Sequence, residues 1–249
     1  FDAYSRQEDS KRNPNYKALN NLVREIPQNY YQEITKPVIF DRAKCWTTPA
    51  NMKIIRTISS TPKIIFTIRN PLEILSSFIV QYRKNLYLEK IMEESEYHPY
   101  YYLPLEDAKC DFLMDSKMDL QKGFYSISHA LSPEVRPFVH FVGYNDLVTN
   151  PKQTLINVYK FLGEEYYEHN FFNIHKLEED EGLVNIEPEG FHEVRTEINK
   201  TSVDPTQVLS KYVIDKYSGA EFWKGKLWTT TKITQTLNFS LEKTTIFLK

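Results

Sequence analysis

The 249-residue sequence has few glycines and cysteines and no long hydrophobic run. Its 7 glycines form neither GxxxxGK[ST] nor GxGxxG, so the residues shown contain no glycine-rich phosphate loop of these types. The 2 cysteines, Cys45 and Cys110, are too few for a disulfide framework, and we interpret them as free thiols in a reducing compartment, with a single bridge between them as the alternative. The longest apolar runs fall well short of about 18 residues, so we expect no transmembrane helix.

The charge balance is close to neutral, with a formal net charge of −2. The chain therefore lacks the overall basic field that steers proteins onto nucleic acid, and we expect no nucleic-acid partner. The histidines and cysteines show no zinc-type spacing, and neither HExxH nor CxxC occurs, so we expect no metal site. We expect a cytoplasmic protein, with a secretory lumen left open and the oligomeric state undefined.

Three short apolar runs predict buried strands. They are "PVIF" at 37–40, "KIIFTI" at 63–68 and "FVHFVGY" at 138–144. Each run is too short for a helix and is rich in β-branched or aromatic residues. Continuous apolarity is typical of strands that are covered on both faces, as in a parallel sheet.

Each run is followed by a helix-start pattern, in which a capping residue precedes proline at the first helical position. The pairs are Thr48-Pro49, Asn70-Pro71 and Asn150-Pro151, and the third helix has a terminating glycine at Gly163. Three strand–turn–helix units predict an α/β fold with a central, mainly parallel sheet flanked by helices.

The other segments give simpler predictions. Residues 13–35 are predicted to be helical with an interruption near Pro27, and 71–93 to form one long helix. Residues 205–217 are predicted to form a helix after Asp204. The tail from Thr236 to Lys249 alternates in hydrophobicity and predicts a C-terminal β-hairpin.

Polar residues follow each predicted strand, where ligands bind in open parallel sheets. Arg69 stands at the start of a helix, and its planar guanidinium suits an anion such as phosphate, which the unpaired N–H groups of the helix also favour. Alternatively, Arg69 pairs with Asp41 or Glu73 and only ties strand to helix. The candidates after the three strands are Asp41, Arg42 and Lys44, then Arg69 and Asn70, then Tyr144, Asn145 and Asp146.

The segment Arg69-Asn70-Pro71 with Ser77 resembles the 3′-phosphate-binding segment of sulfotransferases that use 3′-phosphoadenosine 5′-phosphosulfate (PAPS). "YNDLVTNPKQTLINVYKFLG" at 144–163 is similar to a later segment of this family, whose tyrosine lies near the adenine. "GFHEVRTEINK" at 190–200 resembles the late segment that closes over the nucleotide with basic residues. The resemblance covers roughly residues 36–85 and 136–200.

The resemblance implies a single domain over residues 1–249 with a P-loop-NTPase-like, three-layer architecture. It implies that Arg69, Ser77, Tyr144 and Arg195 bind the PAPS co-substrate. The family's opening strand, phosphosulfate loop and helix have no match before Phe40, and we expect them to precede Phe1.

The implied reaction moves a sulfuryl group from PAPS to a hydroxyl or amine, without a metal ion. Asp41 would take the acceptor proton, while Arg42 and Lys44 would stabilise sulfuryl or leaving-group oxygens. We expect a small-molecule or carbohydrate acceptor. Two alternatives remain open: a P-loop-type nucleotide or small-molecule kinase, which would require Mg²⁺, and a non-catalytic binding protein on the same scaffold.

Overall fold

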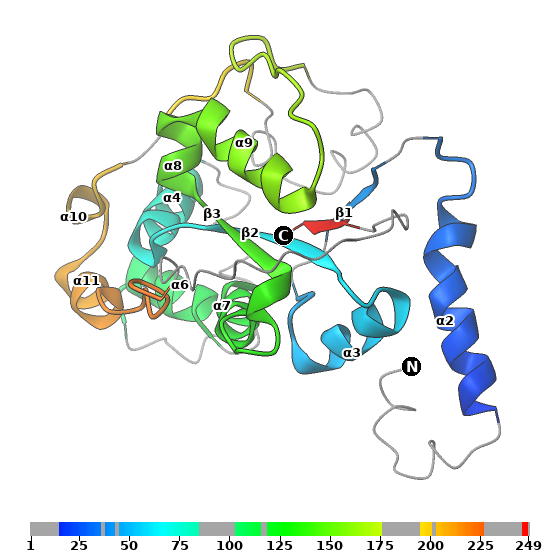
Figure 1. Cartoon of the computed structure of the whole chain (residues 1–249). Coiled ribbons are helices and arrows are strands. Elements are labelled where there is room, and N and C mark those ends of the chain that lie inside the picture. The colour runs from blue at the N-terminus through cyan, green and yellow to red at the C-terminus, as the bar shows by residue number, and fades with distance from the viewer. Residues whose placement is uncertain are drawn as a thin grey trace. The chain divides into compact units, whose positions relative to one another are not determined.

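The computed structural model describes residues 15–35, 38–42, 45–84, 103–115, 119–175, 195–200, 203–226 and 246–248. Within these ranges helices outnumber strands (Figure 1). The helices are α2 Tyr16–Tyr30, α3 Pro49–Ile58, α4 Pro71–Lys84, α6 Leu105–Leu113, α7 Asp119–Ala130, the 3-10 helix η2 Arg136–Phe138, α8 Tyr144–Thr149, α9 Pro151–Leu162, α10 Pro205–Val208 and α11 Lys211–Tyr217. The strands are β1 Phe40–Arg42, β2 Lys63–Ile68, β3 Val139–Gly143 and β4 Ile246–Leu248.

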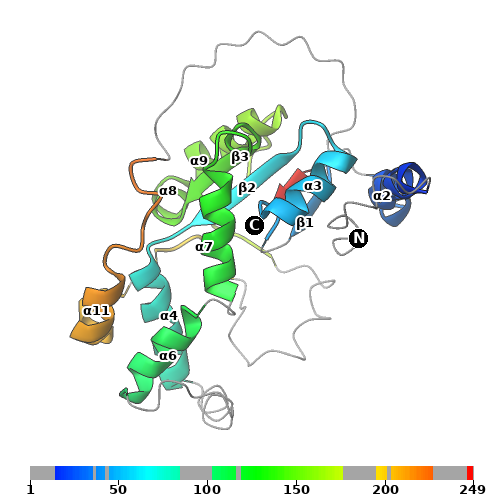
Figure 2. The ribbon, with the colours of Figure 1, turned by 90° about the horizontal axis from the view of Figure 1, so that it is seen from below.

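The four strands form one sheet in the order β1-β4-β2-β3. β4 pairs in parallel with both of its neighbours, so that Phe247 lies opposite Asp41 of β1 and Ile64 of β2. Figure 1 and Figure 2 show β4 in red between these two strands. The described part is therefore a mixed helix and strand fold with a small parallel sheet, compatible with the predicted α/β class.

The expected C-terminal hairpin is wrong for residues 246–248. β1 occupies one edge of β4 and β2 occupies the other, so β4 has no open edge for a hairpin partner. The alternation of the tail indicated a strand correctly, but its partners lie far away in the sequence. The other half of the expected hairpin lies outside the described residues.

The first and last residues of the strands agree with the predicted apolar runs more closely for β2 and β3 than for β1. β2 covers Lys63–Ile68 as predicted. Its three isoleucine side chains and its phenylalanine side chain are all buried, as expected for a continuous apolar run. β3 lies within its predicted run. β1 starts at Phe40, the last residue of "PVIF", and continues into the polar residues Asp41 and Arg42. The strand is shifted because pairing with β4, and not local apolarity, determines which residues form it.

Helix starts agree with the capping patterns. α3, α4 and α9 all begin at the expected prolines, and α9 ends before Gly163, which has a φ of 83°. α2 continues through Pro27 without the predicted interruption. Residues 205–217 form two short helices instead of one, because Ser210 caps a second start by accepting a hydrogen bond from Val213 N–H at 3.2 Å.

The chain divides into two compact units, each made from distant segments. The first unit combines Phe1–Phe66, Lys122–Phe141 and Gly225–Lys249, and in it α2 packs on α3. The second unit combines Thr67–Gln121 and Val142–Lys224. There α4, α6 and α11 lie side by side (Figure 2) around a core of Leu75, Ile79, Cys110, Leu113, Leu209 and Val213.

Candidate functional site

The turn between β2 and α4 places Arg69 at a helix N-terminus. Asn70 closes this turn, since its Oδ1 accepts a hydrogen bond from Leu72 N–H at 2.8 Å. Pro71 takes the first helical position, where its missing N–H costs nothing and its fixed φ suits the helix. Arg69 is therefore held one residue before the cap, beside the positive end of the helix dipole.

Arg69 and Tyr144, two of the residues predicted to bind the nucleotide, lie in contact. The guanidinium carbon of Arg69 is 4.1 Å from the centre of the Tyr144 ring, within cation–π range. Arg69 Nε also donates a hydrogen bond to Glu73 Oε2 at 3.1 Å, and both side chains are less than one fifth exposed. The alternative pairing with Glu73 is therefore present, and it occurs together with the stacking on Tyr144.

A second carboxylate reaches the same turn from the segment after α11. Asn70 Nδ2 donates a hydrogen bond to Glu221 Oε2 at 3.2 Å, and Lys224 Nζ lies 3.3 Å from the same oxygen. Glu73 and Glu221 thus place two acidic side chains close to the start of α4. The helix N-terminus stabilises negative charge, which explains why carboxylates gather at this position.

Two serines on α4 differ in whether their hydroxyls are available to a ligand. Ser76 is buried, and its hydroxyl donates to the Leu72 carbonyl at 2.7 Å within the same helix. Ser77, the predicted phosphate ligand, is half-buried, and its hydroxyl makes no hydrogen bond to another described residue. Of the two hydroxyls, that of Ser77 is the one available to a ligand.

Arg195, the last predicted nucleotide ligand, is exposed. Its neighbourhood is held to the segment after α9 by two main-chain hydrogen bonds, from Ile174 N–H to the Thr196 carbonyl and from Ile198 N–H to the Phe171 carbonyl. The role of Arg195 in nucleotide binding stays a prediction.

The predicted catalytic residues belong to the first unit and are only partly described. Asp41 is half-buried in β1, close enough to the Tyr31 phenol to affect its pKa. Burial raises the pKa of Tyr31, and the negative charge of Asp41 raises it further. The side chain of Arg42 and the whole of Lys44 lie outside the described residues, so the predicted cationic pair stays a prediction.

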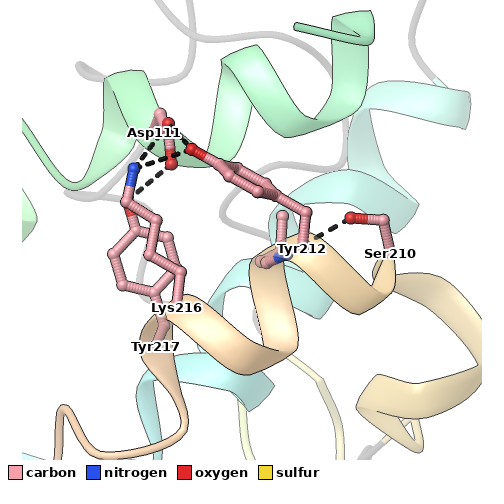
Figure 3. Close-up of polar contacts among 6 residues, drawn as sticks. Asp111, Ser210, Tyr212, Lys216 and Tyr217 are labelled. Carbon is pink, nitrogen blue, oxygen red and sulfur yellow. Dashed lines mark hydrogen bonds and ion pairs between the residues drawn. The ribbon is translucent and has the colours of Figure 1, made fainter.

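A buried carboxylate that the sequence did not reveal joins α6 to α11 (Figure 3). Asp111 accepts hydrogen bonds at 2.7 Å from the hydroxyls of Tyr212 and Tyr217 and from Lys216 Nζ. Its side chain is 2% exposed. Tyr212 and Lys216 are one helical turn apart, but only the fold brings them to Asp111, about 100 residues earlier in the chain.

Both thiols are free, as predicted. Burial raises the pKa of Cys110 to about 12, with the carboxylates of Asp107 and Asp111 adding to the effect, so this thiol is inert at neutral pH. In the described part of the chain no group of three or more histidine, cysteine, aspartate or glutamate residues is placed to hold a metal ion. Across the same residues no helix has the length and apolarity needed to cross a membrane.

A family model described as the sulfotransferase domain matches residues 8–205, which is most of the chain. The chain belongs to the sulfotransferase family. No curated protein matches the chain in a sequence search. The family assignment supports sulfotransfer as the general class of reaction, and it agrees with the resemblance inferred from the segments at Arg69 and Tyr144.

Proposed function

We propose that this protein transfers a sulfuryl group from PAPS to a hydroxyl or amine acceptor. The contact between Arg69 and Tyr144 at the start of α4 is the observation that carries the proposal. A guanidinium beside a helix N-terminus suits a doubly charged ribose phosphate, and a tyrosine ring against it offers a face for an adenine. Ser77 lies on the same helix and offers its hydroxyl to the same phosphate.

In the proposed reaction the bond between sulfur and the phosphate oxygen breaks, while a new bond forms between sulfur and the acceptor atom. The acceptor proton passes to a base, for which Asp41 is the candidate, and the leaving phosphate needs cations nearby. Arg42 and Lys44 are the candidate cations. The charge of Asp41 acts on the neighbouring Tyr31 phenol and raises its pKa, so the two groups lie near each other.

For the acceptor, the compartment and the layers of the fold, we propose what the sequence led us to expect. The acceptor is proposed to be a small molecule or carbohydrate, the compartment to be the cytoplasm, and the sheet to be the middle of three layers. A kinase on the same scaffold is the competing candidate, and it would bind ATP with Mg²⁺.

Nucleotide binding tests the proposal directly. Adenosine 3′,5′-bisphosphate should raise the melting temperature of the protein in a thermal-shift assay, whereas ATP with Mg²⁺ should not. Arg69→Ala should weaken bisphosphate binding in calorimetry by about 10-fold to 100-fold, since a hydrogen-bonded charge contributes about 1.5–3 kcal/mol.

Arg83→Ala is the matched control, because Arg83 lies on α4, the helix that follows Arg69, but pairs with Glu106 through two hydrogen bonds of 2.7 Å. This variant should bind the bisphosphate as the wild type does. Stabilisation by ATP alone would support the kinase. A protein that binds neither nucleotide would be a non-catalytic relative, and the sulfuryl-transfer proposal would be abandoned.

A further inference from the structure

The segment Cys45–Thr48, shortly after β1, is fixed from two sides by hydrogen bonds. It begins three residues after Arg42 and ends at Thr48, the N-cap of α3. Thr47, at its centre, is completely buried together with Ser126 of α7. A buried polar pair of this kind must satisfy its hydrogen bonds internally, so its geometry is informative.

The two buried hydroxyls have one consistent arrangement of protons. Thr47 Oγ1 donates to the Ser126 main-chain carbonyl at 2.6 Å, because that carbonyl can only accept. Thr47 Oγ1 also lies 2.8 Å from Ser126 Oγ. With the threonine proton already used, the Ser126 hydroxyl is the donor in this second bond.

His129, one turn further along α7, holds the same residue through its main chain. Its Nδ1 is hydrogen-bonded to the Thr47 carbonyl. A carbonyl cannot donate, so Nδ1 carries the proton, and the neutral ring has its lone pair on Nε2. Three hydrogen bonds therefore join Thr47 to a single face of α7.

The opposite side of the segment is held to the start of α3. The Cys45 carbonyl accepts hydrogen bonds from Thr48 N–H at 3.1 Å, from Thr48 Oγ1 at 3.0 Å and from Asn51 Nδ2 at 2.8 Å. Asn51 Nδ2 also lies 3.1 Å from Cys45 Sγ. Asp41, on the other flank, is fixed in the sheet opposite Phe247. Both flanks of the predicted catalytic stretch are thus anchored.

We propose that His129 is a positioning residue for sulfuryl transfer, an inference that rests on the proposed function. Its Nδ1–H fixes Thr47 and thereby the segment that follows Asp41, Arg42 and Lys44 in the chain. Without this donor, the buried Thr47 carbonyl would be left unsatisfied and the segment would shift to reach water. His129 acts through the loop and does not itself exchange a proton with the substrate.

Two substitutions separate the donor from the rest of the ring. His129→Leu removes the donor, whereas His129→Asn keeps an N–H at nearly the same distance from the main chain as Nδ1. Ser126→Ala is a milder variant, because it removes only the hydrogen bond between the Ser126 hydroxyl and Thr47. It replaces His129→Leu in the test if circular dichroism shows that His129→Leu does not fold.

Cys45 supplies a readout that does not depend on activity. It is half-buried within the segment, whereas Cys110 is buried with a raised pKa and should react slowly with a thiol reagent. Labelling of native protein with dithionitrobenzoate should be at least 10-fold faster in His129→Leu than in the wild type. It should return to within about 3-fold of the wild-type rate in His129→Asn. Cys45→Ser identifies which thiol is measured.

Kinetics supply the second readout. His129→Leu should lower kcat at least 10-fold and leave the Kd for adenosine 3′,5′-bisphosphate within about 2-fold, and His129→Asn should restore kcat. Unchanged Cys45 labelling in His129→Leu would overturn the proposal. So would a kcat that stays low in His129→Asn while labelling recovers, because the ring would then act through Nε2. Failure of the wild type to bind the bisphosphate would instead overturn the proposed function, and the labelling result would still stand.

Discussion

At the scale of the residue, Asp111 shows how this chain accommodates a buried negative charge. A carboxylate removed from water costs several kcal/mol unless its lone pairs are satisfied. Two phenols and an ammonium group supply the donors, each at 2.7 Å. The cluster connects α6 to α11, and the segment after α11 carries Glu221 to Asn70. One carboxylate therefore supports the elements around the predicted phosphate site.

Replacing Asp111 with asparagine should destabilise the protein by about 2–4 kcal/mol in urea unfolding. The amide offers one oxygen acceptor in place of two charged ones, and Lys216 loses its counter-ion. The estimate lies below that for a fully buried pair, since the Lys216 side chain is 43% exposed.

Asp215→Asn is the control for this change. Asp215 pairs with Lys211 on the surface of α11, where both side chains are mostly exposed, so its loss should cost less than about 0.5 kcal/mol. Equal losses in the two variants would show that the buried cluster contributes nothing special.

The same cluster predicts a loss of stability at alkaline pH. Burial raises the pKa of Tyr217, and its hydrogen bond to Asp111 raises it further. Burial alone would lower the pKa of Lys216, but its hydrogen bonds to Asp111 and Tyr212 outweigh this effect and raise it. Both groups stay protonated in the folded protein above their unfolded values of about 10 and 10.4. Their contribution is therefore complete below pH of about 10 and declines as the pH rises further.

Urea midpoints measured between pH 8 and pH 11 check this prediction. The wild-type midpoint should fall more steeply than that of Asp111→Asn, in which the main partner of both groups has lost its charge. Parallel curves for the two proteins would assign the alkaline loss to other groups, such as Cys110.

At the scale of the element, α9 is the helix whose limits local chemistry determines most completely. Asn150 accepts a hydrogen bond from Gln153 N–H, Pro151 opens the helix, and Gly163 closes it with a φ of 83°. These are short-range effects, which is why the sequence alone predicted this helix to the residue. By contrast, α2 runs through Pro27, where packing on α3 outweighs the missing donor.

Gly163→Ala should destabilise the protein by about 1 kcal/mol, measured as a shift in the urea midpoint. A Cβ at Gly163 would meet no atom within 4 Å, so the cost comes only from the left-handed backbone. Gly219→Ala is the matched control, because its Cβ also has open space and its φ is not in the positive range. A loss at Gly219 equal to that at Gly163 would rule out backbone strain as the cause.

The elements that the sequence did not predict have a common physical reason. α6 carries buried charges at Asp107, Lys109 and Asp111, which disguise its buried face in a hydrophobicity pattern. Similarly, the contact of Arg69 with Tyr144 joins residues 75 positions apart, and no local signal contains it. Residue types and their positions after the strands predicted the candidate residues at the site. Among their neighbours, Glu73 was one of two alternative partners for Arg69, whereas Glu221 and Tyr31 are identified only by the fold.

At the scale of the whole molecule, neither compact unit is a continuous piece of chain. The first unit unites Phe1–Phe66 with Lys122–Phe141 and Gly225–Lys249, and β4 from the last of these lies between β1 and β2. A three-residue strand has little intrinsic preference for any one pairing partner. Its place is set by two neighbours that both offer a parallel edge, which explains why the tail suggested a hairpin instead.

Phe247→Pro tests the central position of β4. Proline cannot donate a ladder hydrogen bond, and the partner carbonyl would be left without its donor. This variant should therefore lose about 1–3 kcal/mol more in urea unfolding than Phe247→Ala, which keeps the main-chain N–H. Equal midpoints for the proline and alanine variants would show that the strand contributes little to the sheet.

The order β1-β4-β2 also has a consequence for synthesis on the ribosome. Phe40 and Lys63 leave the exit tunnel long before their common partner Ile246 has been translated. Until then the facing edges of β1 and β2 have no neighbour in common, and such open edges invite association between nascent chains. We therefore expect the pairing of β1, β4 and β2 to form late in folding and to depend on chaperones that shield exposed strands.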